Sequence, residues 1–217
     1  MKKTTILFDL DGTLVNTGRG ITRCVKSVLT TYGIQEENQE KIETFIGPPL
    51  RDSFQREYGF SLEKAAEAAE IFQKKYHEGA IFECELYPQI KETLQYLKEQ
   101  GYRIAVASSK TESSCKQLME HFEIANYFEI IGGATQDGKI STKIQVLQYV
   151  MDTLKITNKE ELVLIGDTKY DAAGAKAAGI DCIGITYGFG KDPEELKNAG
   201  AIYVCDTLKE VISYLER

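Results

Sequence analysis

The 217-residue sequence is poor in histidine, which occurs only as His77 and His121. Two isolated histidines leave little scope for a zinc site or a catalytic triad built on imidazole. His121 precedes Phe122 in a helical pattern, and we expect it on the protein surface.

Cysteine pairs with metal-ligand spacing are also missing. An odd number of widely separated cysteines favours reduced, mostly buried thiols over disulfides. The five are Cys24, Cys84, Cys115, Cys182 and Cys205.

Clusters of basic residues and long hydrophobic runs are absent as well. The chain has 26 basic and 33 acidic residues, for a formal net charge of -7, and no basic stripe interleaved with aromatic residues. A phosphate backbone needs such a stripe, so we do not expect a nucleic acid polymer as a partner. The first apolar run ends at Asp9, which is too early for a signal-peptide core or a membrane span. We therefore expect a cytoplasmic protein with no membrane partner.

What the sequence does contain is an alternation of short β-branched runs and helical periodicity. Each run ends in a polar or glycine-rich turn, and this alternation is typical of a parallel sheet with helices on both faces. The fold class that it predicts is α/β, a doubly wound, Rossmann-like parallel sheet. The expected strands are residues 4–8, 102–107, 128–133, 161–166, 181–186 and 201–205.

One long segment interrupts the alternation. Residues 18–84 show helical periodicity and no strand pattern, whereas a crossover connection needs only about a dozen residues. The excess predicts an inserted α-helical cap domain, with residues 1–17 and 85–217 forming the core domain. We expect Pro88 in the first turn of the next core helix.

Chemistry-bearing side chains follow several of the predicted strands, where open α/β sheets bind their ligands. Asp9 and Asp11 are two carboxylates one residue apart, which repel each other unless a positive charge lies between them. A turn at Asp11-Gly12 needs only one carboxylate and gives no reason for Asp9. Asp167 alone would be a helix N-cap, but with Asp171 one helical turn later a shared cation is the better explanation. The residues are Asp9 and Asp11 after the first run, Ser108, Ser109 and Lys110 after the second, Asp167 and Asp171 after the fourth, and Lys143 before a helix.

Together these motifs resemble the haloacid dehalogenase superfamily of phosphohydrolases, in its phosphoglycolate phosphatase-like branch with a helical cap. The resemblance covers the whole chain. It rests on Asp-x-Asp-Gly-Thr at 9–13, the insertion at 18–84, the hydroxyl of Ser108, the lysine Lys143 and Gly-Asp-x-x-x-Asp at 166–171.

The resemblance implies an Mg²⁺ site and covalent catalysis. The carboxylates of Asp9 and Asp167 and the main-chain carbonyl of Asp11 would bind the ion, and Asp171 would order the surrounding ligands. Asp9 would attack phosphorus and form an aspartyl-phosphate. Asp11 would protonate the leaving oxygen and later take a proton from water.

The remaining roles are assigned to substrate binding. Ser108 would donate to a phosphate oxygen, and Lys143 would place its ammonium against the phosphate and Asp9. Main-chain amides of Leu10 and Ser109, together with Lys110, are expected to contact the substrate. The third motif reads Ser-Thr-Lys without the proline that often follows, which keeps Lys139 as an alternative to Lys143.

The expected function is hydrolysis of a small phosphomonoester such as phosphoglycolate, a nucleotide or a sugar phosphate. The partner is a small phosphorylated metabolite, and the protein is a monomer or a homodimer. A β-phosphoglucomutase-like mutase and a pyrophosphatase stay as alternatives, although the mutase usually has another residue in place of Thr13. A phospho-aspartate receiver is less favoured, because it needs neither a cap nor Asp11.

The most informative stretch of the expected cap is residues 45–54. Gly47-Pro48-Pro49 is a stiff break between two helical patterns. Arg51, at the start of the next helix, could offer a planar fork to an acidic substrate. The equal alternative is an exposed arginine that is unpaired or lies beside Asp52 or Gln55.

Overall fold

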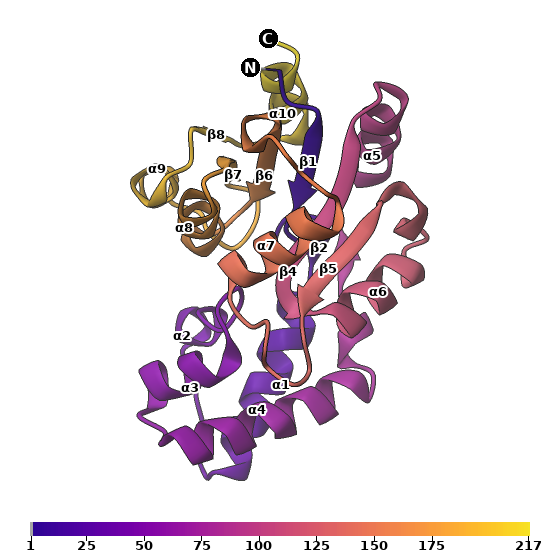
Figure 1. The fold of residues 1–217 in the computed structure, drawn as a ribbon. Helices are drawn as coiled ribbons and strands as arrows, with labels where there is room; N and C mark the ends of the chain where they lie inside the picture. Colours follow the sequence, from indigo (N-terminus) through magenta and orange to yellow (C-terminus); the bar gives the residue numbers. More distant parts are fainter. Residues whose placement is uncertain (1) are drawn as a thin grey trace. The chain divides into compact units, whose positions relative to one another are not determined.

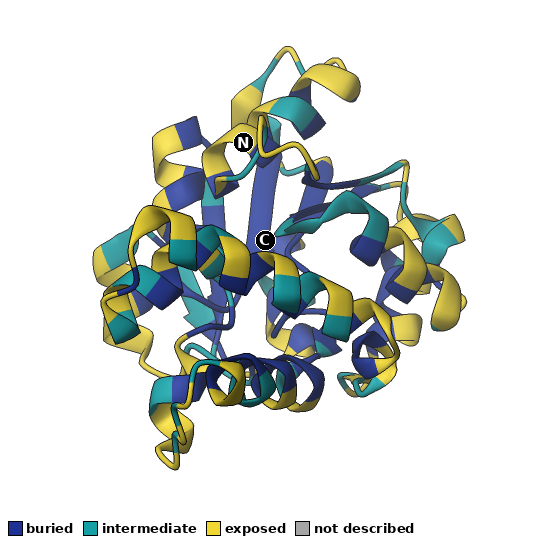
Figure 2. Cartoon of the chain, turned by 90° about the horizontal axis from the view of Figure 1, so that it is seen from below, coloured by how far each residue is buried: buried dark blue, intermediate teal, exposed yellow. Residues whose placement is uncertain are grey.

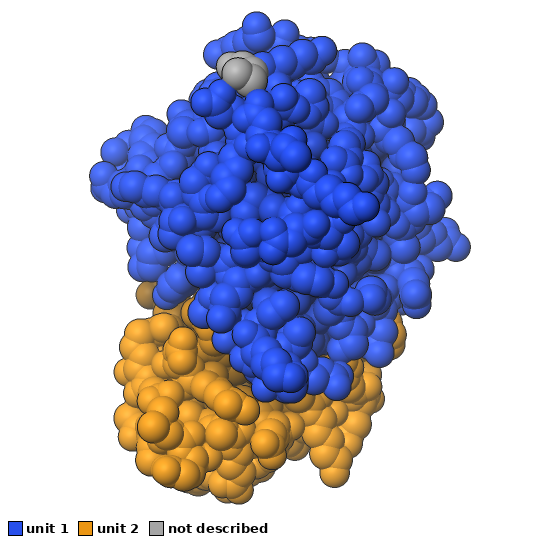
Figure 3. Space-filling view, viewed as in Figure 1, with its two compact units in different colours: residues 1–15, 86–217 blue, residues 16–85 orange. Residues whose placement is uncertain are grey.

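The structure is a computed structural model that describes residues 2–217. The chain divides into two compact units (Figure 3). The first consists of residues 1–15 and 86–217, and the second of residues 16–85. The segments that connect them, β2 (Val15–Asn16) and β3 (Glu85–Leu86), pair as a small two-stranded sheet.

A six-stranded sheet forms the centre of the first unit, in the order β5-β4-β1-β6-β7-β8. Every pairing in it is parallel, and β1 lies between β4 and β6. This is the doubly wound α/β fold that the sequence predicts. The strands are β1 (Thr5–Phe8), β4 (Arg103–Thr111), β5 (Ile130–Ala134), β6 (Leu162–Gly166), β7 (Asp181–Ile185) and β8 (Tyr203–Cys205).

Helices cover both faces of this sheet (Figure 1). One face packs with α7, α8 and α9 into a hydrophobic cluster that includes Leu7, Leu147 and Leu164. The buried residues of α5, α6 and α10 lie outside that cluster, on the opposite face. The helices are α5 (Ile90–Glu99), α6 (Glu112–His121), α7 (Lys143–Thr153), α8 (Lys169–Ala178), α9 (Pro193–Ala199) and α10 (Leu208–Leu215), with short 3₁₀ helices at Ala125–Tyr127 and Lys159–Glu161.

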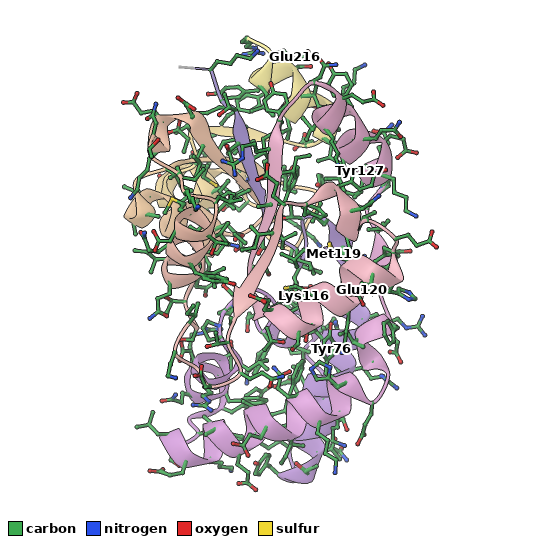
Figure 4. All side chains as sticks on the ribbon, turned by 45° about the vertical axis from the view of Figure 1, so that its right-hand side comes forward. Tyr76, Lys116, Met119, Glu120, Tyr127 and Glu216 are labelled. Atoms are coloured by element: carbon green, nitrogen blue, oxygen red, sulfur yellow. The ribbon has the colours of Figure 1, made fainter. Side chains whose placement is uncertain are left out.

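The strands of the six-stranded sheet are buried or half-buried, whereas the helices are amphipathic and present exposed outer faces (Figure 2). In α6, Met119 is buried while Lys116 and Glu120 on the same helix are exposed (Figure 4). His121, at the end of α6, is exposed, as the sequence predicts. The five cysteines are thiols outside any disulfide, and all except Cys84 are buried.

The second unit is helical and packs around aromatic side chains. Phe54 stacks on Phe60 with ring centroids 5.6 Å apart and meets Phe45 edge to face at 4.9 Å. Its helices are α1 (Gly18–Thr31), α2 (Gln39–Glu43), α3 (Leu50–Tyr58) and α4 (Leu62–His77), followed by a 3₁₀ helix at Ala80–Phe82. No helix within residues 2–217 has the length and apolar character needed to cross a membrane.

Some details differ from the sequence-based expectation. Strand β4 continues to Thr111, four residues beyond the predicted end at Ala107. Helix α2 was not expected; it is only five residues long and its N-cap is Asn38. Pro88 lies outside α5, which begins at Ile90, so the expectation of a first-turn proline is wrong. The residue between them, Gln89, has a left-handed backbone and ends the preceding turn.

Candidate active site

Asp9 is buried at the end of β1, where its carboxylate meets the ammonium of Lys143. Nζ of Lys143 lies 2.6 Å from Oδ1 of Asp9. The same Nζ lies 2.6 Å from Oδ1 of Asp171 and donates to the carbonyl oxygen of Ala107 at 2.7 Å. These acceptors engage all three N–H groups of the ammonium. Lys143 therefore ties the end of β1 and the middle of β4 to the first turn of α8.

The start of α7 places Lys143 in this position. Thr142 is the N-cap, and its Oγ1 accepts the N–H of Gln145 at 3.4 Å. In return, Oε1 of Gln145 accepts the N–H of Thr142 at 3.1 Å, which completes a capping box. Lys139, the alternative lysine, has a side chain that is 83% exposed and pairs with Asp137. The structure thus brings Lys143, and not Lys139, to Asp9.

Helix α8 begins next to Asp167 and carries Asp171 in its first turn. Its N-cap is Thr168, so the reading of Asp167 as a helix cap is wrong. Oδ2 of Asp171 accepts the N–H of Thr168 at 3.0 Å and its hydroxyl at 2.7 Å. With Lys143 on the other oxygen, Asp171 is held from both sides.

Asp167 follows β6 and is fully buried. The hydroxyl of Thr13 donates to Oδ1 of Asp167 at 3.2 Å, and the N–H of Phe189 donates to Oδ2 at 2.8 Å. The hydroxyl of Tyr187 donates to the carbonyl oxygen of Thr13 at 2.8 Å. A loop after β7 and the turn after β1 therefore fix this carboxylate together.

The turn after β1 depends on Gly12, which has a φ of +83°. Its N–H donates to the carbonyl oxygen of Val15, and the carbonyl of Leu10 accepts N–H groups from residues 13, 14 and 15. A methyl group at Gly12 would lie 2.1 Å from Oδ2 of Asp167. Only glycine both adopts this φ without strain and lets the turn approach the carboxylate so closely.

Asp11 pairs with a second lysine. Nζ of Lys110 lies 2.9 Å from Oδ2 of Asp11, and the two side chains are only 8% and 10% exposed. Two carboxylates that stand one residue apart are thus paired with lysines from two different elements.

Ser108 is buried near the end of β4. Its Oγ accepts the backbone N–H of Lys110 at 3.3 Å, and the neighbouring carbonyl of Ala107 is the one that Lys143 contacts. Ser109, between Ser108 and Lys110 in the sequence, is half-buried. Asp9 and Asp167 directly follow their strands, whereas Ser108 and Ser109 lie in the last four residues of β4.

The ionisation of the site follows from its burial. Burial raises the pKa of Asp9 to about 7, against the lowering effect of Lys143. Burial, followed by the charges of Asp171 and Asp9, raises the pKa of Asp167 well above its usual value. Burial alone would lower the pKa of Lys143, but the charges of Asp171 and Asp9 raise it.

The donor set suits a hard divalent cation. Asp9, Asp167 and Asp171 each offer a carboxylate oxygen, and these oxygens lie within 4.8 Å of one another. All are buried, and Lys143 is the ammonium that faces Asp9 and Asp171. Three carboxylates and one ammonium leave an excess of negative charge that a buried site cannot readily hold. Oxygen ligands with this excess fit Mg²⁺.

Arg51 lies on α3 in the second unit and is exposed. Within residues 2–217 its guanidinium forms no ion pair with an acidic side chain. Its carbonyl oxygen accepts the side-chain amide of Gln55. Within the second unit, the side chain of Arg51 is exposed, which is one of the two expectations. The other, a role in substrate selection, stays a prediction.

Sequence reasoning missed the residues that hold the acidic side chains in place. They are Thr13, Thr168, the amide of Phe189 and Tyr187. In the sequence, Thr13 counts only as part of the first motif and as an argument against a mutase, although its position next to the turn glycine was a usable signal for a structural role. Nothing local to residues 187–189 indicates that this loop returns to Asp167.

The chain is similar in sequence to known hydrolases, in keeping with the acidic site described above. The sequence model of the haloacid dehalogenase-like hydrolases matches residues 6–185. The chain belongs to this family. It is 34% identical over 211 residues to a 5'-nucleotidase of Pseudomonas aeruginosa, covering 97% of this chain and 95% of the relative. It is 32% identical over 185 residues to a phosphoglycolate phosphatase of Aquifex aeolicus, covering 80% of each.

A solved structure extends the likeness to the whole fold. A crystal structure of a predicted phosphatase from Clostridium acetobutylicum aligns over 100% of both chains with a TM-score of 0.96 and 40% identity. The protein is therefore a phosphatase of the haloacid dehalogenase family, in the phosphoglycolate phosphatase-like branch.

Proposed function

We propose that this protein is an Mg²⁺-dependent phosphatase that hydrolyses a small phosphomonoester through an aspartyl-phosphate on Asp9. The observation that carries the proposal is the position of Asp9 at the carboxyl end of the central strand. There it lies buried against Lys143 and within reach of Asp167 and Asp171.

Asp9 and Asp167 would hold the ion through their carboxylates, and Asp11 would hold it through its main-chain carbonyl. When bound, Mg²⁺ supplies positive charge that reduces the repulsion between Asp9 and the phosphate. Asp171 does not need to touch the ion. Its two oxygens accept from Lys143 and Thr168, so it orients the lysine that faces Asp9.

In the first step, a carboxylate oxygen of Asp9 forms a bond to phosphorus while the bond to the leaving oxygen breaks. Asp11 gives its proton to that oxygen, and the alcohol leaves. In the second step, Asp11 takes a proton from water, and the resulting hydroxide hydrolyses the acyl phosphate and restores Asp9. Ser108 and the amides of Leu10 and Ser109 donate hydrogen bonds to the phosphate oxygens. The substrate in this proposal is a metabolite of the cytoplasm.

Lys143 stabilises the negative charge that Asp9 and the phosphate bring together. In this structure its three N–H groups all have protein acceptors. A direct contact with a phosphate oxygen therefore requires one of them to be exchanged, and the backbone carbonyl of Ala107 is the acceptor without a formal charge. We propose that this is the contact that the phosphate replaces.

The substrate class is a small metabolite ester. Relatives named a 5'-nucleotidase and a phosphoglycolate phosphatase support nucleoside monophosphates and phosphoglycolate as the first candidates. We propose Arg51 as a residue that selects for acidic substrates, since its guanidinium carries no ion pair within the described part of the chain. Sugar phosphates and pyrophosphate complete the panel, and interconversion of sugar phosphates without release of phosphate would favour a mutase.

The test is turnover of p-nitrophenyl phosphate with Mg²⁺ and with EDTA, followed by kcat/KM values for the panel. We expect steady release of p-nitrophenol that requires Mg²⁺. Asp9→Asn should lower kcat by several orders of magnitude, as loss of a covalent nucleophile does. The control is Asp152→Asn, the same change at an exposed position of α7. Stoichiometric labelling that stops after one event would instead identify a phospho-aspartate receiver.

A further inference from the structure

The ion pair between Lys110 and Asp11 has the properties of a functional contact. Its Nζ to Oδ2 distance is 2.9 Å, and both side chains are at least nine-tenths buried. An exposed ion pair contributes little to stability or order. A buried one fixes the geometry of both groups, because neither can turn back to water without losing its partner.

The backbone of β4 is shaped to deliver this lysine. Ala107 pairs with Gly132 and Thr111 pairs with Ala134, so β4 advances four residues where β5 advances two. The extra residues form a bulge at positions 108–110, and bulges re-aim side chains next to active sites. The hydroxyl of Ser108 accepts the N–H of Lys110 inside the bulge.

Strand β5 supports the bulge through Gly133. A methyl group at this position would lie 2.6 Å from the carbonyl oxygen of Lys110 and 2.6 Å from the backbone nitrogen of Glu112. The two backbones are therefore in close contact at the point where the lysine leaves the strand. This contact and the hydrogen bond to Ser108 hold the backbone of Lys110 in place.

We propose that Lys110 is a positioning residue that holds the carboxyl group of Asp11 in the orientation for proton transfer, an inference that rests on the proposed function. A proton donor must lie within hydrogen-bond reach of the oxygen it protonates. With Oδ2 bound to Lys110, Oδ1 is the oxygen through which Asp11 would pass the proton. During phosphoryl transfer the Oδ1–H bond breaks, the proton goes to the leaving oxygen, and that oxygen keeps the electron pair of its bond to phosphorus.

This role differs from the sequence-based expectation that Lys110 binds the substrate. A lysine bound to phosphate would help every phosphate ester alike. A lysine that acts through Asp11 helps most where the leaving group needs a proton. An alkoxide leaving group depends on general acid catalysis, whereas p-nitrophenolate is stable as an anion.

The experiment compares kcat/KM of Lys110→Met on p-nitrophenyl phosphate and on an alkyl ester, phosphoglycolate or glycerol 3-phosphate. kcat/KM reports the first transfer to Asp9, so a slow second step does not mask the difference. We expect a loss at least about tenfold larger for the alkyl ester, since general acid catalysis contributes about 10² to 10⁴ in rate. The matched control is Lys139→Met, which removes an exposed lysine, and its values should equal those of wild type.

A double-mutant cycle with Asp11→Asn identifies the group through which Lys110 acts. If Lys110 positions Asp11, adding Lys110→Met to Asp11→Asn should lower kcat/KM for the alkyl ester by less than about twofold. Lys110→Arg keeps the charge and should restore part of the alkyl ester activity. If Lys110→Met does not fold, as judged by its thermal unfolding, Lys110→Gln is measured in its place.

The outcomes separate the two proposals. Equal losses on both esters would assign Lys110 to phosphate binding, and no loss on either would leave the ion pair with a structural role; both results overturn the positioning role. Wild-type protein that hydrolyses neither these esters nor any other member of the substrate panel would overturn the proposed function and this inference with it. Hydrolysis of both by wild type, with a leaving-group-dependent loss in the variant, supports both.

Discussion

The ammonium of Lys143 and the carboxylate of Asp9 lie 2.6 Å apart, although α7 and β1 are distant in the sequence. This pair makes Lys143 part of the resting site and not a side chain that the substrate must first draw in. Asp171 completes the arrangement by accepting from the same ammonium.

Replacing Lys143 should affect both activity and stability. We expect Lys143→Met to lower kcat by about 10² or more, the usual loss when one preorganised donor is removed. Without the ammonium, the buried carboxylates of Asp9 and Asp171 lose their counter-charge, which should cost about 3 to 5 kcal/mol of unfolding free energy in EDTA. Urea unfolding and steady-state kinetics measure the two effects. A variant with wild-type turnover would remove Lys143 from the mechanism.

Asp167 should control the response to metal. We expect Asp167→Ala to raise the Mg²⁺ concentration for half-maximal activity and to lower the maximum, because the cation loses a buried oxygen ligand. The control is Asp192→Ala, the same change at the N-cap of α9, where the loss is about 1 kcal/mol of stability. The Mg²⁺ titration of this control should match wild type. If the folded Asp167 variant also matched wild type, Asp167 would not be a ligand.

The stability of the metal-free protein should fall as the pH rises. Burial raises the pKa of Asp9 from 3.8 to about 7, so between these values the native state binds a proton that the unfolded state has lost. Stability decreases with pH wherever the native state binds more protons. From pH 5.5 to 7.5 the titration of Asp9 alone should lower the free energy of unfolding by about 2 kcal/mol.

Urea unfolding in EDTA at these two pH values tests the expectation. Asp9→Asn lacks the titrating group, so its pH dependence should be smaller than that of wild type by this amount. Because Mg²⁺ binds the ionised carboxylate, its stabilising effect should grow over the same range. Identical pH dependence in wild type and Asp9→Asn would show that Asp9 does not titrate there.

Arg51 should influence the choice of substrate and leave phosphoryl transfer intact. We expect Arg51→Ala to raise KM for acidic esters such as phosphoglycolate, while p-nitrophenyl phosphate turnover stays nearly unchanged. Arg56→Ala removes the same charge from the same helix and serves as the control. Comparable losses on both substrates, or on neither, would contradict the role.

The fold was predictable because its signals are local. Runs such as residues 161–166 combine β-branched residues with a following glycine, and the alternation with helices is confirmed as a parallel sheet. The end of β4 was missed because a bulge continues the strand through polar residues. The five-residue α2 is too short for its periodicity to be recognised.

The candidate site was predictable in part, for a related reason. Parallel strands bring their carboxyl ends to one edge, so Asp9 and Asp167 could be placed near each other without knowing a single contact. The capping box at Thr142 and the bulge before Thr111 determine which lysine reaches which aspartate. Neither feature produces a periodic pattern in the sequence that would reveal it. The catalytic roles of these residues stay predictions.

The place of β1 between β4 and β6 also has a consequence for synthesis of the chain. Thr5 pairs with Arg103 on one side and with Leu162 on the other, so the strand that carries Asp9 is made first and finds its second neighbour late. Loop closure over such distances slows folding more than it costs stability. A nascent chain that ends before Leu162 still lacks Asp167 and Asp171. The residues of the site can therefore assemble only after the chain has emerged from the ribosome as far as Asp171.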